Sequence, residues 1–237
     1  MRVEVWSDVA CPWCYIGKAR FEQALETFAH KDDVEVVYRS FELDPSLSKG
    51  VVSDVIPMLA KKYGMSLEQA NAAEARVASN AHDSGLGYIP GAHDVGNTFD
   101  MHRLIHFAAE KGRQKEIVGV LFTNHFADER SLFDDDRLVE LAVEAGLDAD
   151  EARAVLADDT AYADAVRDDE REASALGATG VPFFVLDRKY GISGGQPAEV
   201  FAQALDEAWK NYTPRVGLVS VGGEADGVCG PDGCEIA

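Results

Sequence analysis

Cys11 and Cys14, three positions apart, have the most specific spacing for chemistry in this chain. They form a Cys-Pro-Trp-Cys motif, and Pro12 suits the first position of a helix, where its missing N–H costs no hydrogen bond. Cys11 then falls at the N-cap, where free backbone N–H groups and the helix dipole stabilise a thiolate. The motif therefore predicts thiol–disulfide exchange, with Cys11 as the attacking sulfur and Cys14 as the resolving one.

Two other interpretations of the motif stay open. A zinc half-site also uses Cys-x-x-Cys, but zinc needs two further ligands, and the other cysteines lie more than 200 residues away. A structural disulfide that closes so small a loop would add little stability. The redox interpretation is favoured because a strand pattern precedes the motif and a helix pattern follows it.

A second pair, Cys229 and Cys234, is spaced by four residues near the C-terminus. The intervening Gly-Pro-Asp-Gly allows a turn tight enough for a disulfide. One hypothesis is an accessory redox dithiol that exchanges with the first pair or senses an oxidant. The other is a disordered acidic end whose cysteines do little, and a zinc site joining both pairs would need the tail to fold back.

Other polar residues are weaker candidates. His102 and His106 lie at i, i+4 on an expected helix, but with no third ligand in register we expect a solvated helix face rather than a metal site. Lys18 is expected to be a surface lysine, and Asp134 to Asp136 a helix start with favourable charge. We therefore predict no metal and no cofactor.

The elements that must position the motif follow from periodicity. Residues 2–7 alternate as a strand, a helix opens at Pro12 with one apolar face, and residues 34–43 form a second strand. This order predicts a βαβ unit with parallel strands. Between residues 54 and 176 we find no convincing strand but repeated helix starts, which include a capping box at Ser66 and helices that open at Asp148 and at Thr160. Residues 84–96, rich in glycine, are a candidate mobile loop.

Strand patterns return after Gly180. Residues 182–186 and 190–193 predict a hairpin, a helix follows Pro197, and residues from 214 onward read as a tail. Taken alone, Pro182 is an ordinary proline at the start of a strand.

Composition excludes some classes of function. A net charge of −20 argues against nucleic acid and against anionic membranes as partners. Charges within the first eight residues leave no room for a signal peptide, and no apolar run is long enough to span a membrane. We therefore expect a cytoplasmic protein, in which four cysteines serve catalysis or metal binding rather than a disulfide scaffold.

Three stretches carry a family resemblance: SDVACPWCYIGKARFE, VVYRSFELDP and GATGVPFFVLDRKYGISGGQP. With them the chain resembles the thioredoxin superfamily, in particular the DsbA-like group and its cytoplasmic FrnE-like disulfide oxidoreductases. The resemblance implies an α/β thioredoxin-like fold with a large all-helical insertion. The expected domains are 1–50 with 177–213, a helical domain at 51–176, and a tail at 214–237.

The same resemblance implies roles for residues around the motif. Pro182 would follow a cis peptide bond and face the cysteines as a catalytic residue, while Pro12, Trp13 and the backbone of Val181 would bind the substrate. Substrates would be protein or small-molecule disulfides and thiols, glutathione among them. The strongest oxidants of the group carry His where this chain has Trp13, so we expect a less oxidising protein, suited to reduction or isomerisation.

An alternative stays within the same architecture. Glutathione-dependent isomerases and kappa-type transferases resemble this chain in the insertion and in stretches like RSFELDP, but they typically have Ser at the position of Cys11. A zinc-stabilised binding module is the alternative outside enzymes.

Overall fold

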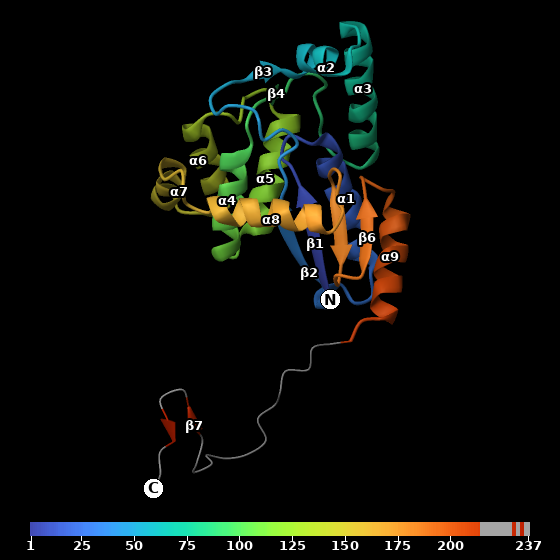
Figure 1. Cartoon of the computed structure of the whole chain (residues 1–237). Helices are drawn as coiled ribbons and strands as arrows, with labels where there is room; N and C mark the ends of the chain where they lie inside the picture. Colours follow the sequence, from blue (N-terminus) through green and yellow to red (C-terminus); the bar gives the residue numbers. More distant parts are fainter. Residues whose placement is uncertain (214–228, 231–232, 235–237) are drawn as a thin grey trace.

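The structure is a computed structural model that describes residues 1–213, 229–230 and 233–234. Its main sheet has the strand order β2-β1-β5-β6. The four strands are β1 (Arg2–Ser7), β2 (Glu35–Ser40), β5 (Phe183–Leu186) and β6 (Tyr190–Ser193). β1 pairs with β2 in parallel and with β5 in antiparallel orientation, and β5 and β6 form a hairpin. The predicted βαβ unit and hairpin are confirmed (Figure 1).

Helices account for most of the remaining chain. They are α1 (Pro12–Thr27), α2 (Val55–Tyr63), α3 (Leu67–Asp83), α4 (Phe99–Glu110), α5 (Gln114–Ala127), α6 (Asp135–Glu144), α7 (Ala149–Ala157), α8 (Ala163–Ala175) and α9 (Ala198–Lys210), with a short 3-10 helix at Lys31–Asp33. Seven of them, α2 to α8, lie between β2 and β5 in the sequence, so the thioredoxin-like fold carries the expected helical insertion.

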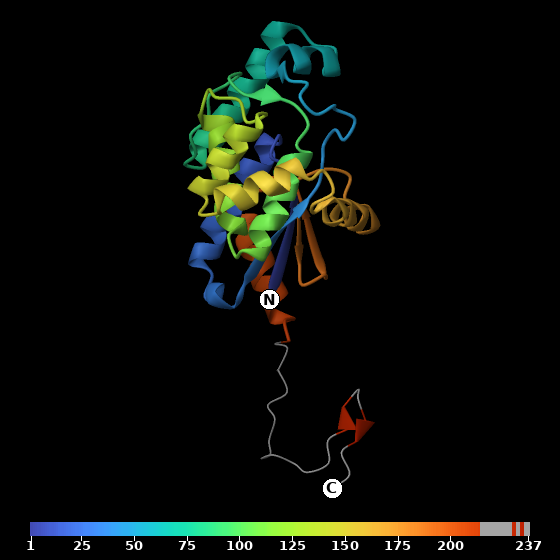
Figure 2. The same cartoon turned by 90° about the vertical axis from the view of Figure 1, so that its left-hand side faces the viewer.

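The sheet is covered on both faces. On one face, Val5 and Phe184 pack with Phe21 of α1 and Phe201 of α9. On the other face, a smaller apolar cluster contains four buried residues: Trp6, Phe183, Val185 and Ala173 of α8. Figures 1 and 2 show α8 lying across this second face. The last helix of the insertion is therefore part of the sheet's own core.

Several sequence boundaries differ from the structure for physical reasons. The second strand was expected to reach Leu43 but ends at Ser40, because its partner β1 ends at Ser7, the residue paired with Ser40. A helix was expected from Thr160, but α8 begins at Ala163 because Tyr162 has a left-handed backbone with φ 59°. The expected capping box at Ser66 is confirmed.

The segment 84–96 is held in place at its centre. Tyr88 and His93 are buried, and the Ile89 N–H donates to the Phe126 carbonyl oxygen at 2.8 Å. Two-residue strands, β3 (Ser53–Asp54) and β4 (Asp94–Val95), pair in antiparallel orientation, so this region does contain strands, contrary to the expectation. The segment is anchored to α5 and β3 rather than loose.

Candidate active site

Cys11 is the N-cap residue of α1. Its backbone is extended (φ −96°, ψ 110°), Pro12 follows as the first helical residue, and the Cys14 N–H donates to the Cys11 carbonyl oxygen at 3.0 Å. The Cys11 N–H in turn donates to the Asp8 carbonyl oxygen at 3.1 Å, which fixes the turn between β1 and α1. The predicted helix start at the motif is confirmed. Cys11 thus lies where the positive end of the helix dipole favours a thiolate.

The two cysteines are both free thiols, and they differ in environment. Burial, together with the hydrogen bond and the charge of Cys11, raises the pKa of Cys14 well above its ordinary value of 9.0. Cys14 is 2 % exposed and Cys11 is 5 % exposed, and only Cys11 lines the neighbouring cleft. Cys14 is therefore protonated at neutral pH and shielded from outside reagents.

Residues 181–182 approach the motif from β5. The Val181–Pro182 peptide bond is cis, as the resemblance implies, and the Cys11 thiol donates to the Val181 carbonyl oxygen at an Sγ–O distance of 3.6 Å. Gly17 allows α1 to come close, because a Cβ at this position would lie 3.1 Å from Cγ of Pro182 and 3.2 Å from Cα of Gly195. The absence of a side chain at Gly17 lets the helix and the cis-proline turn meet.

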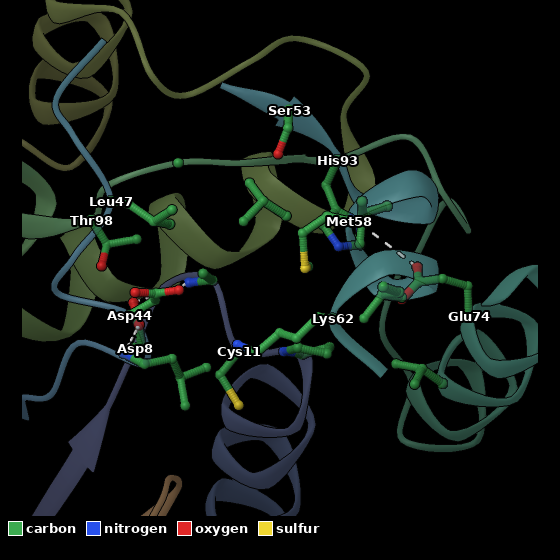
Figure 3. A pocket seen from close by; sticks show the side chains of 18 of the residues that line it. Asp8, Cys11, Asp44, Leu47, Ser53, Met58, Lys62, Glu74, His93 and Thr98 are labelled. Atoms are coloured by element: carbon green, nitrogen blue, oxygen red, sulfur yellow. Dashed lines mark hydrogen bonds and ion pairs between the residues drawn. The ribbon is translucent and has the colours of Figure 1, made fainter. Parts of the chain in front are cut away.

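A cleft of about 650 Å³ opens beside Cys11, between the start of α1 and the inserted helices α2 and α3 (Figure 3). Pro12 and Trp13 line it on the side of the motif, and Trp13 is 38 % exposed. The opposite wall is largely apolar, with Val55, Met58, Leu59 and Tyr63 from α2. A concave, mostly apolar space with a few polar groups has the character of a small-molecule or peptide site.

Asp8 lies beneath the motif and was not singled out from the sequence. Its carboxylate accepts hydrogen bonds from the Leu43 N–H at 2.7 Å and from the Ala10 N–H at 3.2 Å, and it lies 3.5 Å from Nε2 of His102. Burial favours the neutral acid, but His102 and the Leu43 N–H outweigh it and hold the pKa of Asp8 below 3.8. This buried anion ties together β1, the segment after β2 and α4.

The expectation of a solvated face for His102 and His106 is wrong. His102 is 1 % exposed beside Asp8, while Nε2 of His106 lies 3.0 Å from an oxygen of Asp169 and 3.1 Å from the hydroxyl of Ser40. Their i, i+4 spacing reflects a helix face packed against two buried carboxylates. In the part of the chain that the structure describes, no group of three or more His, Cys, Asp or Glu residues is arranged to hold a metal ion.

Lys18 and the terminal cysteines complete the set of sequence candidates. Lys18 forms an ion pair with Glu22 at 2.8 Å and does not line the cleft. The backbones of Cys229 and Cys234 face each other as the two-residue strands β7 (Cys229–Gly230) and β8 (Gly233–Cys234). Their side chains, and residues 214–228, lie outside what the structure describes, so the accessory redox role of this pair stays a prediction.

The sheet order, the inserted helices and a cysteine pair at a helix start beside a cis-proline define a thioredoxin-like oxidoreductase of the DsbA type. Residues 2–206 match the family model described as DSBA-like thioredoxin domain, and the chain belongs to this family. Among the described residues, no helix is long and apolar enough to cross a membrane.

Three known proteins illustrate the relationship. A crystal structure of a probable DsbA oxidoreductase, SCO1869 from Streptomyces coelicolor, is 60% identical with a TM-score of 0.88, covering 100% of this chain and 99% of that one. The uncharacterized protein YwbO of Bacillus subtilis (strain 168) is 28% identical over 89% of this chain and 98% of its own length. The cytosolic disulfide reductase DsbM from Pseudomonas aeruginosa with GSH shares the fold at 18% identity and a TM-score of 0.62, covering 89% of this chain and all of that one.

Proposed function

We propose that this protein catalyses thiol–disulfide exchange through Cys11 and Cys14. The observation that carries the proposal is the contrast between the two thiols. Cys11 caps α1 at the edge of an open cleft, whereas Cys14 is buried and its pKa is raised. A nucleophile needs access and thiolate character, and a resolving thiol is best kept protonated until the mixed disulfide has formed.

The exchange proceeds in two balanced steps. The Cys11 thiolate attacks one sulfur of a disulfide R–S–S–R, forming a Cys11–S–S–R bond and releasing one RS⁻, which takes up a proton. Cys14 then loses its proton and attacks Cys11 sulfur, so that the protein disulfide forms and the second RS⁻ leaves and is protonated. The protein dithiol loses two electrons and two protons, and the substrate gains them; the reverse sequence oxidises a dithiol substrate.

The roles of the surrounding residues follow from their positions. Pro12 and Trp13 form the side of the cleft next to Cys11 and are proposed to contact the substrate. The Val181 carbonyl oxygen, 3.6 Å from the Cys11 sulfur, accepts a hydrogen bond from the thiol. Pro182, which follows Val181 through a cis bond, is proposed to shield the reacting sulfurs from water. Val181 backbone groups are also proposed to pair with an extended substrate.

The direction of exchange and the substrate are proposed from the cleft. With Trp13 in the motif, the motif itself supplies no imidazole to support the thiolate, which favours reduction or isomerisation over strong oxidation. The cleft size suits a small ligand, and Lys61 and Lys62 give it two cations for substrate carboxylates. Glutathione meets this description, and the solved DsbM structure is one with GSH. We propose that the protein is a FrnE-like, cytoplasmic reductase.

The test separates the two cysteines in a background where Cys229 and Cys234 are replaced by Ser. Mixed with an aromatic disulfide such as Ellman's reagent, Cys14→Ser should accumulate a mixed disulfide on Cys11 visible by mass spectrometry. Cys11→Ser should form none and should lose disulfide reductase activity. Full activity in Cys11→Ser would end the proposal.

The glutathione-dependent isomerase alternative is separated by the same variants. That chemistry needs one activated glutathione and no resolving thiol, so it would survive in Cys14→Ser with an aromatic substrate and added glutathione. Exchange through a dithiol would not turn over in that variant. The free thiol at position 11, where those enzymes carry Ser, supports the exchange mechanism.

A further inference from the structure

Glu74 is a carboxylate buried in the wall of the cleft that contains Cys11. It belongs to α3 and is 4 % exposed. Its Oε2 accepts hydrogen bonds from the Tyr88 hydroxyl at 3.0 Å and from the Gly91 N–H at 3.2 Å. These two donors fix the position of the carboxylate oxygen in the wall of the cleft. Both Glu74 and Cys11 line the same space, as Figure 3 shows.

This carboxylate has no cation to balance it within the described residues. The one group in ion-pair range is His93, whose Nδ1 lies 3.8 Å from Oε2, and burial lowers the pKa of His93 so that the ring is neutral at neutral pH. Lys61 and Lys62 also line the cleft, yet neither pairs with Glu74 within 4.0 Å. A buried carboxylate without a counter-charge is costly, and the cost disappears when a cation enters.

His93 provides a second unsatisfied group at the same place. It is 6 % exposed, it lines the cleft, and its Nδ1 has no hydrogen-bond partner in the described chain. With its proton on Nε2, the ring offers Nδ1 as an acceptor. A carboxylate oxygen and a ring nitrogen that lie 3.8 Å apart can both accept from one group that has several N–H donors and a positive charge.

The thiol of Cys11 lies on the same cleft as this wall. Burial and the charge of Glu74 raise the pKa of Tyr88, and the charge of Cys11 contributes in the same direction. Tyr88 is the residue whose hydroxyl holds Glu74. Because Cys11 and Glu74 both line the same cleft, one small molecule bound there can contact both residues.

We infer that Glu74 and His93 bind the ammonium group of a small amino-bearing disulfide or thiol whose sulfur reacts at Cys11. This inference rests on the proposed exchange function and names the substrate class for it. The electron balance is that given above: the disulfide takes two electrons and two protons from the dithiol. The ammonium is bound without changing its protonation.

The experiment compares two disulfides that differ in this group. Reduced protein is mixed with cystamine or with bis(2-hydroxyethyl) disulfide, and the rate of protein oxidation is followed by quenching and mass spectrometry. A second pair of probes has six carbons instead of two between the sulfur and the amine or hydroxyl group. The longer pair is included because the distance from Cys11 to the far wall of the cleft sets which probe can contact both ends. Dithiothreitol, as a free dithiol, gives the intrinsic preference of the two probes, and about 1 M salt reduces the Debye length to about 3 Å and suppresses long-range attraction.

The measured quantity is the rate with the amine probe divided by the rate with the hydroxyl probe of the same length. For wild-type protein this ratio should be about tenfold higher than for dithiothreitol at one of the two lengths, because one charge-assisted hydrogen bond contributes about that much. Glu74→Gln should remove this excess. Glu68→Gln, which removes an equal charge from an exposed site on the same helix, should keep it.

The possible failures are distinct. If the reduced wild-type protein reacts with none of the probes, the exchange function itself is wrong. If all probes react but the wild type shows no excess over dithiothreitol at either length, the ammonium site is wrong and the exchange function stands. If Glu74→Gln folds poorly, the wild-type comparison decides alone, because it needs no variant.

Discussion

The carboxylate of Asp8 accepts a 2.7 Å hydrogen bond from the backbone N–H of Leu43. This bond joins the turn before the Cys11 helix to the segment that leaves β2, and it is formed by a buried anion beside His102. The turn that precedes Cys11 is therefore fixed by the interactions of the Asp8 carboxylate as well as by packing.

Replacing Asp8 by Asn should lower the free energy of unfolding at pH 7 by about 1–3 kcal/mol, because a buried charged acceptor is lost. The pKa of Asp8 is depressed on folding, so its contribution is full above the ordinary value of 3.8 and is lost as pH falls through the lower folded value. Urea unfolding from pH 7 to pH 3 measures the difference, which should shrink at the acid end. A difference that stays constant with pH would contradict this account; exposed Asp83→Asn should change stability by less than about 0.5 kcal/mol.

Cys14 should resist alkylation at neutral pH while Cys11 reacts. Because burial raises the pKa of Cys14, its thiolate forms only well above pH 9.0, and access is limited as well. In Cys11→Ser, iodoacetamide should modify Cys14 far more slowly in folded protein than in urea-unfolded protein, with peptide mass spectrometry as the measurement. Equal rates in the two states would show that Cys14 is not protected.

Gly17→Ala should destabilise the protein by about 1–3 kcal/mol and slow the exchange reaction. The added Cβ would press on Pro182 and on the backbone of Gly195, and a tightly packed interface does not absorb a methyl group without displacement. Thermal unfolding and a disulfide reductase assay measure the two effects. Gly119→Ala is the matched control, because nothing lies within 4 Å of its Cβ and alanine favours the helix by about 1 kcal/mol. Gly17→Ala as stable as wild type would contradict the packing argument.

His125 should make the protein less stable as the solution becomes mildly acidic. Burial and the charge of His93 lower the pKa of His125 to about 3, from an ordinary 6.5. Between pH 6.5 and about pH 3, the His125 ring is therefore protonated in the unfolded state and neutral in the folded state. The free energy of unfolding falls by about 1.4 kcal/mol per pH unit below 6.5. Between pH 6.5 and pH 5, the free energy of unfolding of His125→Leu should fall by about 2 kcal/mol less than that of wild type, as measured by urea unfolding. Exposed His30→Gln should follow the wild-type curve, and a His125→Leu curve parallel to wild type would refute the assignment.

Local signals made the core of this structure predictable. Pro12 after a strand marked the helix that Cys11 caps, and Ser66 and Asp148 marked helix starts through their side-chain caps. These features depend on residues within a few positions of one another. The resemblance added the cis bond before Pro182, which composition alone would not predict.

What escaped prediction depends on contacts between distant segments. Asp8 and His102 are far apart in sequence, as are Glu74 and His93, and nothing local marks either pair as neighbours. The helix α5 shows no clear helical period, because its partly exposed side carries Gly119 and Val120 among the polar residues, while Ile117, Leu121 and Phe122 are buried. The expectation for His102 failed for the same reason, since a helical spacing does not say what the helix packs against.

The placement of α8 limits how this protein can be trimmed. Trp6 is fully inaccessible because α8 covers it, and its indole N–H donates at 2.8 Å to the carbonyl oxygen of Asp169 in that helix. Deleting residues 51–176 as if they were an independent domain would remove α8 and expose an apolar surface around Trp6 to water. A minimal version of the enzyme has to retain α8, and a graft of the inserted helices onto another scaffold has to leave it behind.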